Sequence, residues 1–575
     1  MRDMGFRDYF SFKIGGPAGF GIKSVGLIFA RVATRSGYQT FTYSEYPSLI
    51  RGGHNSVQTV VAKEEVNAPV KHTDFLVALD QMTIDLHKGE LQSGSAVLFD
   101  KGLNLKTDGL PEGVRVFAIP LAELVAEVGG KEIMRNTLAT AAMMALNGGE
   151  IQHLKDLVAE EFKNKPQEVT DLNFAVIEAG YKYVQDNLAG EVRKVLEPQS
   201  EVKKRMVING NEAIARGAVA GGLQFAAIYP MTPTSNVLHN LAPWQEKFGF
   251  VYKQPEDEIS ALGMALGAAH AGARSMVATS GGGFALMSEA YGLAGITETG
   301  VVIIEGMRGG PATGLPTWTE QGDLRFVLHA HQSDFPRIVL APGDSQEAFD
   351  YTMMAFNLAD KYQTPVVVLV DKMICESDQS YIPFVYDEYQ VDRGKVVWEK
   401  VEEFKRYALS DDGISARSVV GSGNYFYANA DEHDEIGYAN EEIDNRNMQM
   451  RKRMQKLVTC KDSDMEAPRL YGPEDAEVTI VSWGSNKGAI LEALKELPNV
   501  NFVHNVWMNP FPVEAMRSRL EKAKYLLNIE CNFSGQYAGV VAEQIGIRIA
   551  DNLLKYDGRP IYPEEIVEKV RSIKN

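Results

Sequence analysis

The sequence contains few cysteines and no paired cysteine motif. Cys375, Cys460 and Cys531 are the three cysteines among its 575 residues, and they lie far apart. A cluster held by four thiolates cannot be built from three cysteines. If the protein takes part in electron transfer, its iron–sulfur centre must lie on another chain. We expect the three residues to be reduced structural thiols in a reducing compartment.

The sequence also lacks long hydrophobic runs and an excess of basic residues. No apolar run approaches the ~20 residues that cross a bilayer. The N-terminus carries acidic residues where a signal peptide is basic, and no apolar stretch follows. The formal net charge of −18 argues against a nucleic-acid partner, because phosphates need a basic surface. We therefore expect a cytoplasmic protein with no membrane or nucleic-acid partner.

The length and the alternation of strand and helix patterns predict a multidomain α/β protein. A first α/β domain is expected over residues 1–190, followed by a charged linker at 191–204. A second, doubly wound domain is expected over 206–377, a polar connecting segment over 378–468, and a last α/β domain over 469–575. Strands expected in the first domain include Tyr9–Ile14, Gln39–Tyr43, Ser56–Ala62, Phe75–Leu79, Ala96–Phe99 and Val114–Ile119. Those of the later domains include Phe225–Ile228, Val251–Lys253, Ser275–Thr279, Val301–Glu305, Arg337–Leu340, Pro365–Val370, Val478–Ser482, Phe502–Val506 and Tyr525–Glu530.

Two neighbouring motifs in the second domain point to chemistry. The strand Phe225–Ile228 ends in a turn, Tyr229–Ser235, whose two prolines hold Met231 and Thr232 out of helix. Hydroxyl groups on such a rigid turn suit binding of an anion or a carbonyl oxygen. Glu258 then starts a helix rich in small residues, where the helix dipole favours the charged carboxylate. A plain turn and a plain helix cap are the alternatives for each motif alone.

Three glycine-rich loops follow predicted strands. Gly15–Gly21 joins a strand to a helix, a position that can bind phosphate, but its glycine spacing fails the dinucleotide pattern. Ile22 separates Gly21 from Lys23-Ser24, which excludes an ATP phosphate loop, and a tight turn is the alternative. Ser280–Phe284 can approach a bound ring or phosphate closely. The loop from Arg308 to Gln321 carries no charge between Arg308 and Glu320, which favours a pocket wall over an exposed loop.

An ordered set of motifs resembles the α subunits of 2-oxoacid:ferredoxin oxidoreductases, most closely the 2-oxoglutarate type with a γ-like domain fused at the N-terminus. The resemblance covers nearly the whole chain. The matching segments are Gly210–Ala213, Tyr229–Ser235, the helix from Glu258, Ala278–Phe284, Gly310–Thr317, Thr319–Asp323, Asp334–Gly343, Glu432–Glu435 and Lys555–Pro560. The fold implied is a γ-like α/β domain, a pyrimidine-type thiamine-diphosphate domain and a transketolase-C-like domain.

The resemblance also implies a function and residue roles. The enzyme would oxidatively decarboxylate a 2-oxoacid with coenzyme A, giving acyl-CoA, carbon dioxide and reduced ferredoxin, and some members run the reverse reaction. Glu258 would hydrogen-bond the pyrimidine ring of thiamine diphosphate. Thr232, Arg308 and Thr313 would bind substrate. The cofactor would also contact Tyr229, Pro230, Gly281 and Gly282. Coenzyme A is assigned to Gly15, Gly19, Gly21 and Arg51.

The resemblance further implies a partner. The Gly-Asp-Gly motif with its following Asn, which binds magnesium and diphosphate in thiamine enzymes, is absent. A β subunit would therefore supply Mg²⁺, the rest of the thiamine diphosphate site and the [4Fe–4S] cluster, in a dimer of αβ heterodimers. Because this chain is acidic, the main docking face for ferredoxin is expected on that subunit. No metal site is expected in this chain.

One departure concerns the substrate. Trp318 stands where pyruvate-type members carry an arginine, so no cation is expected there. Arg308 or a partner residue would then bind the second carboxylate of 2-oxoglutarate. Pyruvate and branched-chain 2-oxoacids remain alternatives. So do a non-oxidative thiamine enzyme of the transketolase or decarboxylase type, and a nucleotide-binding regulatory subunit. The acidic segment Asp431–Glu435 matches no metal pattern and is expected to be a solvated loop.

Overall fold

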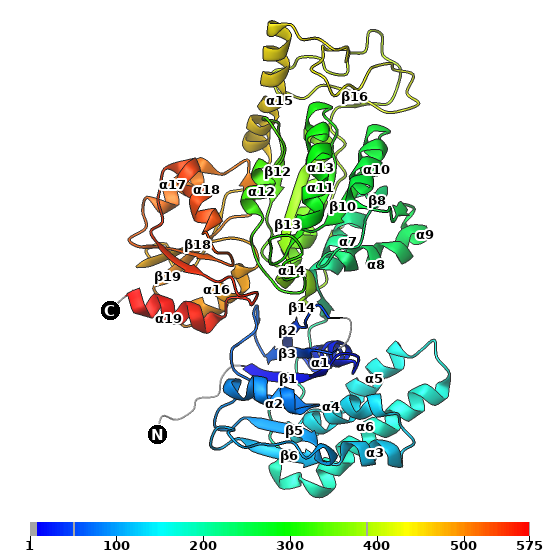
Figure 1. Ribbon diagram of the computed structural model, residues 1–575, viewed down its shortest axis with the longest axis vertical. Helices are drawn as coiled ribbons and strands as arrows, with labels where there is room; N and C mark the ends of the chain where they lie inside the picture. Colours follow the sequence, from blue (N-terminus) through cyan, green and yellow to red (C-terminus); the bar gives the residue numbers. More distant parts are fainter. Residues whose placement is uncertain (1–8, 50–51, 387–388, 574–575) are drawn as a thin grey trace. The chain divides into compact units, whose positions relative to one another are not determined.

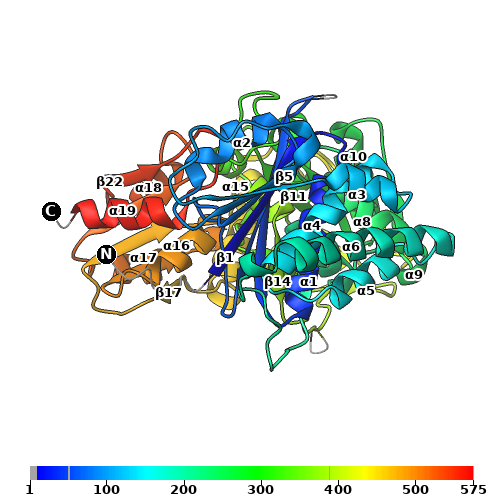
Figure 2. The same cartoon turned by 90° about the horizontal axis from the view of Figure 1, so that it is seen from below.

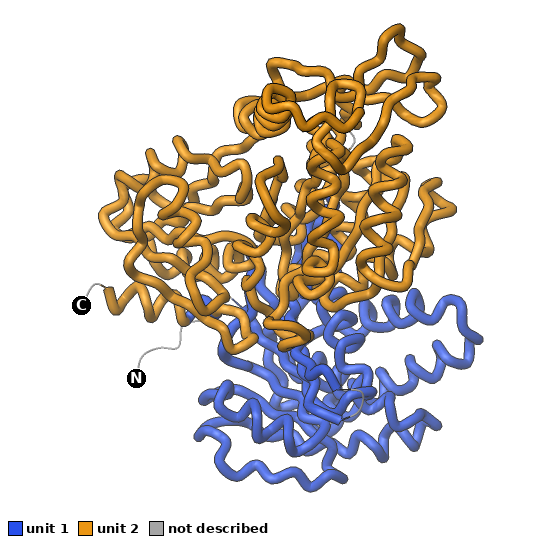
Figure 3. The backbone as a smooth tube through the Cα atoms, turned by 45° about the horizontal axis from the view of Figure 1, so that its top comes forward, with its two compact units in different colours: residues 1–208, 377–384, 562–564 blue, residues 209–376, 385–561, 565–575 orange. Residues whose placement is uncertain are grey.

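The computed structural model describes residues 9–49, 52–386 and 389–573, which form two compact units (Figure 3). Unit 1 contains residues 1–208, 377–384 and 562–564, and unit 2 contains 209–376, 385–561 and 565–575. Both units contain sheets with parallel and antiparallel strand pairs, covered by helices, which confirms the α/β class. The finer division into four segments stays a prediction. Among the described residues, no helix combines the length and apolar composition that a membrane span requires.

Unit 1 is built on an eight-stranded sheet with the order β6-β5-β4-β1-β3-β2-β14-β7 (Figure 1). Strands β1, β4, β5 and β6 run parallel, whereas β3, β2, β14 and β7 join by antiparallel pairs. Helices α1, α4, α5 and α6 lie together (Figure 2). The strands are β1 (Tyr9–Pro17), β2 (Gln39–Glu45), β3 (His54–Ala62), β4 (Phe75–Ala78), β5 (Ala96–Asp100), β6 (Arg115–Ile119), β7 (Met206–Ile208) and β14 (Asp378–Tyr381). The helices are α1 (Ile22–Arg35), α2 (Gln81–His87), α3 (Leu121–Glu127), α4 (Arg135–Leu146), α5 (Gln152–Glu161) and α6 (Gln167–Asn187).

Strand β14 is a feature that the sequence did not predict. It follows the parallel strands of unit 2 in the chain but pairs between β2 and β7 in unit 1. Gln379 lies opposite Phe41, and the backbone N–H of Thr40 donates to the hydroxyl of Ser380 at 2.9 Å. The sheet of unit 1 is therefore completed by residues that lie far away in the sequence.

Unit 2 contains a seven-stranded sheet with the order β20-β12-β13-β11-β10-β8-β9, in which all neighbours but β20 and β12 are parallel. The predicted strands of this region are all present. They are β8 (Phe225–Ala227), β9 (Val251–Lys253), β10 (Ser275–Thr279), β11 (Val302–Met307), β12 (Ile338–Leu340) and β13 (Val366–Asp371), with β20 (Trp507–Asn509) from the C-terminal region. The helices are α7 (Gly210–Ala220), α8 (Ser235–Leu241), α9 (Gln245–Phe248), α10 (Glu258–His270), α11 (Gly281–Ile296), α12 (Leu324–His329), α13 (Ser345–Tyr362) and α14 (Lys372–Glu376).

A second sheet of unit 2 has the order β17-β19-β18-β21-β22. A buried ion network joins it to α13: Glu347 accepts from Nε2 of His504 at 2.9 Å and from Lys487 at 2.7 Å. The strands are β17 (Arg469–Tyr471), β18 (Val478–Ser482), β19 (Val500–His504), β21 (Leu526–Glu530) and β22 (Asp551–Leu554). The helices that follow the connecting segment are α15 (Ile443–Ser463), α16 (Asn486–Leu494), α17 (Val513–Leu520), α18 (Gln536–Ile545) and α19 (Pro563–Ile573).

The polar connecting segment packs on the core through buried charges, and its basic run at Asn445–Lys456 lies within the helix α15. It also contains the short pair β15 (Val396–Val397) and β16 (Arg417–Ser418). Lys452 and Lys456 on α15 lie 2.5 and 2.6 Å from the carboxylate of Glu298, and burial lowers the pKa of Lys456 to about 7. Glu432 pairs with Arg453 at 2.6 Å, and His433 is buried. The expectation of a solvated loop at residues 431–435 is therefore wrong for its central residues.

The three cysteines are buried and unpaired, as expected for structural thiols. Burial raises the pKa of the Cys460 thiol, so this residue stays a protonated thiol near neutral pH.

Candidate active site

The predicted motifs of the second domain meet at one edge of the seven-stranded sheet. The turn at residues 229–235 follows β8, α10 follows β9, α11 follows β10, and the loop from Arg308 follows β11. These strands are parallel, so the segments that follow them emerge at the same, carboxyl edge. Ligand sites of open α/β sheets lie at this edge.

The Tyr229–Ser235 turn is held in place by its neighbours. The hydroxyl of Thr234 donates to the carbonyl oxygens of Met231 and Thr279, both at 3.1 Å. Asn211, from the Gly210–Ala213 motif, donates to the carbonyl of Pro233 at 2.9 Å. Thr234 and Asn211 are fully buried, so they fix the turn from the side of the protein interior. Thr232 and Tyr229 of the same turn are half-buried.

Glu258 lies at the start of α10 and is 3% exposed. The helix is capped by its neighbour, because the carboxylate of Asp257 accepts from the backbone N–H of Ser260 at 2.7 Å. The Oε1 atom of Glu258 is buried and has no hydrogen-bond partner among the described residues. A buried carboxylate oxygen without a partner is costly. The folded chain thus presents an acceptor that a bound group can satisfy.

Gly283 forms the floor beside this carboxylate, although the sequence reasoning singled out Gly281 and Gly282. A Cβ atom at Gly283 would lie 2.6 Å from Cγ and 2.7 Å from Oε1 of Glu258, so no side chain fits. At Gly281 a Cβ atom would collide with the carboxylate of Asp323. Gly282 has open space around it. The glycine run therefore lets α11 begin directly against two carboxylates.

Arg308 and Thr232 are brought together as a pair. Nη1 of Arg308 donates to the backbone carbonyl oxygen of Thr232 at 2.7 Å. Two carboxylates lie near the guanidinium, Glu305 on β11 and Asp323. Burial, followed by the charges of Asp323 and Asp371, raises the pKa of Glu305 well above its usual range. Burial lowers the pKa of Arg308, but a guanidinium stays charged at neutral pH.

The loop from Arg308 doubles back on itself and buries two hydroxyl groups. The backbone N–H of Leu315 donates to the carbonyl of Gly309 at 2.7 Å. The hydroxyls of Thr317 and Thr319 are buried and have no hydrogen-bond partner in the described chain. Thr313, by contrast, is exposed at the loop tip, and no hydrogen bond joins it to Thr232 or Arg308 in the described ranges. Thr317 was missed because a threonine in a loop carries no signal of burial.

A cation does stand at Trp318, contrary to expectation. The guanidinium of Arg559 stacks on the Trp318 ring, 3.6 Å from its centroid. The backbone supports this contact, since the N–H of Thr319 donates to the carbonyl of Gly558 at 3.2 Å. Arg559 belongs to a motif that was noted for the resemblance, but nothing in the sequence indicates that it meets Trp318.

Unit 1 carries the first glycine loop at the end of β1. Gly19 and Gly21 have φ angles of 91° and 71°, and Gly21 is the N-cap of α1. Gly15 and Gly16 belong to β1, and a Cβ atom on either would collide with a neighbouring side chain. Arg51 lies outside the described residues.

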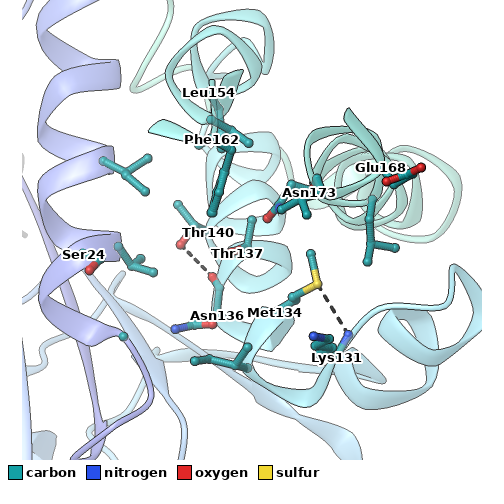
Figure 4. Close-up of a pocket in the computed structure, with 17 residues that line it drawn as sticks. Ser24, Lys131, Met134, Asn136, Thr137, Thr140, Leu154, Phe162, Glu168 and Asn173 are labelled. Atoms are coloured by element: carbon teal, nitrogen blue, oxygen red, sulfur yellow. Dashed lines mark hydrogen bonds between the residues drawn. The ribbon is translucent and has the colours of Figure 1, made fainter. Parts of the chain in front are cut away.

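A cavity of about 530 Å³ opens beside this loop (Figure 4). Gly21 lines it, and Ser24, Thr137 and Asn173 contribute polar groups from α1, α4 and α6 to walls that are otherwise mostly apolar. Asn136 donates to the backbone carbonyl of Phe20, while its Oδ1 atom is buried without a partner among the described residues. Apolar walls with a few polar groups are typical of small-molecule sites, and the volume lies in their usual range.

The site around Glu258 and the cavity in unit 1 together indicate a class of protein. A buried, unpartnered carboxylate beside a glycine-started helix, at the carboxyl edge of a parallel sheet, is the arrangement of an α/β enzyme that binds an organic cofactor. The family model described as "Pyruvate flavodoxin/ferredoxin oxidoreductase, thiamine diP-bdg" matches residues 216–452. A second, described as "Pyruvate ferredoxin/flavodoxin oxidoreductase", matches residues 11–183.

Individual proteins agree with these family models. The 2-oxoacid:ferredoxin oxidoreductase subunit alpha of Saccharolobus solfataricus is 33% identical and covers 98% of this chain and 97% of its own. The 2-oxoglutarate synthase subunit KorA of Methanothermobacter thermautotrophicus is 32% identical over 63% of this chain and 97% of its own length. The structure of the Magnetococcus marinus 2-oxoglutarate:ferredoxin oxidoreductase, with 2-oxoglutarate, coenzyme A and succinyl-CoA bound, superimposes with a TM-score of 0.93. It is 31% identical and covers 98% of this chain and 99% of that chain. This chain belongs to the 2-oxoacid:ferredoxin oxidoreductase α subunits.

Proposed function

We propose that the chain is the α subunit of a 2-oxoglutarate:ferredoxin oxidoreductase. Its reaction is the coenzyme A-dependent oxidative decarboxylation of 2-oxoglutarate to succinyl-CoA and carbon dioxide, with reduction of ferredoxin. The likeness to the Magnetococcus marinus enzyme over the whole chain carries the substrate assignment. The arginines at the site support it, because each carboxylate of a dicarboxylic acid needs a cation when it is desolvated.

Glu258 is the proposed catalytic residue. Its unpartnered Oε1 and the missing side chain of Gly283 fit a flat ring with a hydrogen-bond donor, as the aminopyrimidine of thiamine diphosphate presents. The bound cofactor supplies the electron sink for decarboxylation. Glu258 holds a proton at the ring nitrogen opposite the amino group. Gly281 and Gly282 line the same ring, and Tyr229 and Pro230 close the turn over it.

The substrate is oriented by Thr232 and Arg308. Because Arg308 donates to the backbone carbonyl of Thr232, the guanidinium is held beside this residue, and the guanidinium and the threonine hydroxyl can together hold one carboxylate. Thr317 presents a buried hydroxyl in the same loop. Arg559, stacked on Trp318, is the second candidate cation for the distal carboxylate. Thr313 is retained as a contact from the loop tip.

A β subunit is the proposed partner. The outer faces of α10 and α11, next to Glu258, carry Ile259, Met264 and Leu286, which are 54%, 45% and 52% exposed. An exposed apolar face beside an active carboxylate favours a protein contact. The β subunit would supply Mg²⁺, the diphosphate half of the cofactor site and the [4Fe–4S] cluster, and would dock ferredoxin. The complex would be a dimer of αβ heterodimers in the cytoplasm.

Coenzyme A is proposed to bind at the glycine loop of unit 1. Gly19 and Gly21 lie in the turn that leads into the N-terminus of α1, where backbone N–H groups favour phosphate, and Gly15 is retained as a contact from β1. Arg51 is the expected cation. The cavity beside Gly21 offers mostly apolar walls with scattered hydrogen-bonding groups, which suits the uncharged part of such a ligand.

The test is a 2-oxoacid panel on the co-purified complex with a viologen dye as acceptor. We expect the highest kcat/KM with 2-oxoglutarate. Pyruvate and branched-chain acids should have a kcat/KM lower by about tenfold or more, because they lack the hydrogen bond of a second carboxylate to a charged group. Arg308→Gln should lower kcat/KM for every 2-oxoacid. Arg559→Gln should lower it for 2-oxoglutarate alone if Arg559 holds the distal carboxylate, while the exposed Arg548→Gln serves as the control. A higher kcat/KM with pyruvate would refute the substrate assignment.

A further inference from the structure

Arg308 lies among carboxyl groups but forms an ion pair with none of them in the described part of the chain. Its guanidinium donates through Nη1 to the backbone carbonyl of Thr232. The acidic side chains whose charges act on it are Asp323, in front of α12, and Glu305, three residues earlier on β11. Because neither closes an ion pair with Arg308 in the described ranges, most of its N–H groups stay available.

Glu305 is a fully buried carboxyl group that receives no donor. No N–H or O–H group of the described residues donates to either of its oxygens. An ionised carboxylate in this position would lose its hydration without a replacement, which costs far more than burying a neutral acid. The ionisable groups that face it are Asp323, Asp371 on the neighbouring strand β13, Arg308 and the thiol of Cys375. Burial and the two acidic neighbours raise the pKa of Glu305 well above its usual range.

Asp323 is the carboxyl group that Glu305 reaches. Its Oδ2 atom lies against Gly281, since a Cβ atom there would collide with it. Gly281 begins α11, and the N-terminus of a helix favours a negative charge. Although Asp323 directly precedes α12, its side chain forms no capping hydrogen bond to that helix. Burial raises the pKa of Asp323, while the hydrogen bond from Glu305 and the charge of Arg308 oppose this effect.

The hydrogen bond between the two acids needs a proton, because an ionised carboxylate can only accept. Glu305 is the more deeply buried of the two, whereas Asp323 lies at a helix N-terminus beside a guanidinium. The proton therefore belongs to Glu305, and the negative charge belongs to Asp323.

This proton decides the charge that a substrate meets at Arg308. With Glu305 neutral, the carboxylate of Asp323 and the guanidinium of Arg308 cancel each other. With both acids ionised, the three groups would carry a net negative charge, and a second carboxylate would be repelled. The hydrogen bond also gives Asp323 a partner other than the guanidinium, which agrees with the lack of an ion pair among the described residues.

We propose that Glu305 acts as a neutral carboxylic acid that donates a hydrogen bond to Asp323 and so keeps the guanidinium of Arg308 open to the carboxylate of the 2-oxoacid. The inference rests on the proposed function, in which Arg308 binds substrate. Glu305 is a positioning residue, because it acts through Asp323 and is itself buried.

Two substitutions separate the hydrogen bond from the shape of the side chain. Gln is neutral and carries N–H donors, so Glu305→Gln should retain the hydrogen bond to Asp323. Leu fills a similar space without a donor, so Glu305→Leu removes the bond and frees Asp323 to pair with Arg308. Glu246→Gln, exposed on α9, is the matched control.

The measurement is steady-state turnover of 2-oxoglutarate by the co-purified complex with a viologen dye as acceptor. Thermal unfolding checks that each variant is folded. We expect Glu305→Leu to raise KM by about tenfold or more, the size of one hydrogen bond to a charged group, and kcat to stay within about twofold of wild type. Glu305→Gln and Glu246→Gln should stay within about twofold of wild type in both constants, well under one hydrogen bond.

The pH profile of kcat/KM is a second readout, which a purely structural role of Glu305 would not set. Because the acid keeps its proton, wild type and Glu305→Gln should share one profile through the neutral range. A step that is present in wild type and absent from Glu305→Gln would show that Glu305 titrates there, and this would overturn the inference. If Glu305→Leu does not fold, the Gln variant and this profile still decide the question.

Three further results would overturn the inference and leave the proposed function standing. They are an unchanged KM in Glu305→Leu, an equal rise of KM in the Leu and Gln variants, and a KM in Glu305→Gln well below that of wild type. The last result would mean that the substitution removed a charged carboxylate. If the wild-type complex does not turn over 2-oxoglutarate at all, the proposed function fails instead.

Discussion

Replacing Glu258 by Gln tests the proposed catalytic carboxylate with little structural disturbance. The helix α10 is capped by Asp257, not by Glu258, so it should form in the variant. Gln has the same shape and fits beside Gly283. We expect the free energy of unfolding to change by about 1 kcal/mol or less, the size of a charge–dipole contribution.

The expected loss of activity is much larger than the loss of stability. An amide cannot hold a proton at the ring nitrogen as a carboxylate can. A general acid–base contribution of roughly 100-fold or more should disappear, which corresponds to about 2.7 kcal/mol of activation free energy. Because this exceeds the expected change in unfolding free energy, a folded but inactive protein is the predicted phenotype.

The assay is exchange of the C2 proton of bound thiamine diphosphate, followed by NMR in the assembled complex. Glu256→Gln is the matched control, because Glu256 is exposed and precedes the helix. Its exchange rate should equal that of wild type. Unchanged exchange in Glu258→Gln, or a larger loss in Glu256→Gln, would refute the reasoning and move the catalytic role elsewhere.

Three further predictions concern the rest of the chain. Gly283→Ala should impair turnover nearly as much as Glu258→Gln, because the Cβ atom of Ala would displace the carboxylate of Glu258. The overpacking should also lower the free energy of unfolding by about 1–3 kcal/mol. A wild-type kcat in this variant would contradict the prediction. Glu347→Gln should destabilise the chain by about 3 kcal/mol at pH 7, because the buried Lys487 then keeps only Asp344 as a carboxylate partner. Burial raises the pKa of Glu347, but His504 and Lys487 lower it by more, so the pKa in the folded state lies below its usual range. Its contribution is thus present above its unfolded pKa and lost as the pH falls, so denaturant titrations should show the two proteins converging in acid. The purified chain alone should be colourless and free of iron; stoichiometric iron and sulfide without a partner would contradict the cysteine argument.

Local patterns were sufficient to predict much of unit 2. The strands at Val251–Lys253 and Ser275–Thr279 begin and end where they were expected, because turns and apolar runs mark them in the sequence. The helix start at Glu258 was also recognisable, since Asp257 provides a cap. These features depend on residues that are close together in the chain.

The features that were missed depend on contacts between remote segments. Asp378–Tyr381 is short and polar and has no apolar alternation, so only its pairing with β2 and β7 makes it a strand. Arg559 reaches Trp318 through the fold of the C-terminal region. The buried hydroxyl of Thr317 likewise follows from how its loop closes. Burial and tertiary pairing decide such positions, and no local pattern reports them.

The strand β14 bears on how the chain could be divided into two polypeptides. A break between residues 192 and 205 would leave β7 and β14 on the larger piece and expose the edge of β2 on the smaller one. Bare strand edges pair readily with a complementary strand. The KorA relative that matches 63% of this chain shows that shorter relatives exist. A version of this protein split at the linker should therefore assemble as two subunits that share one continuous sheet, so that gene fusion here would join polypeptides already interlocked by their backbones.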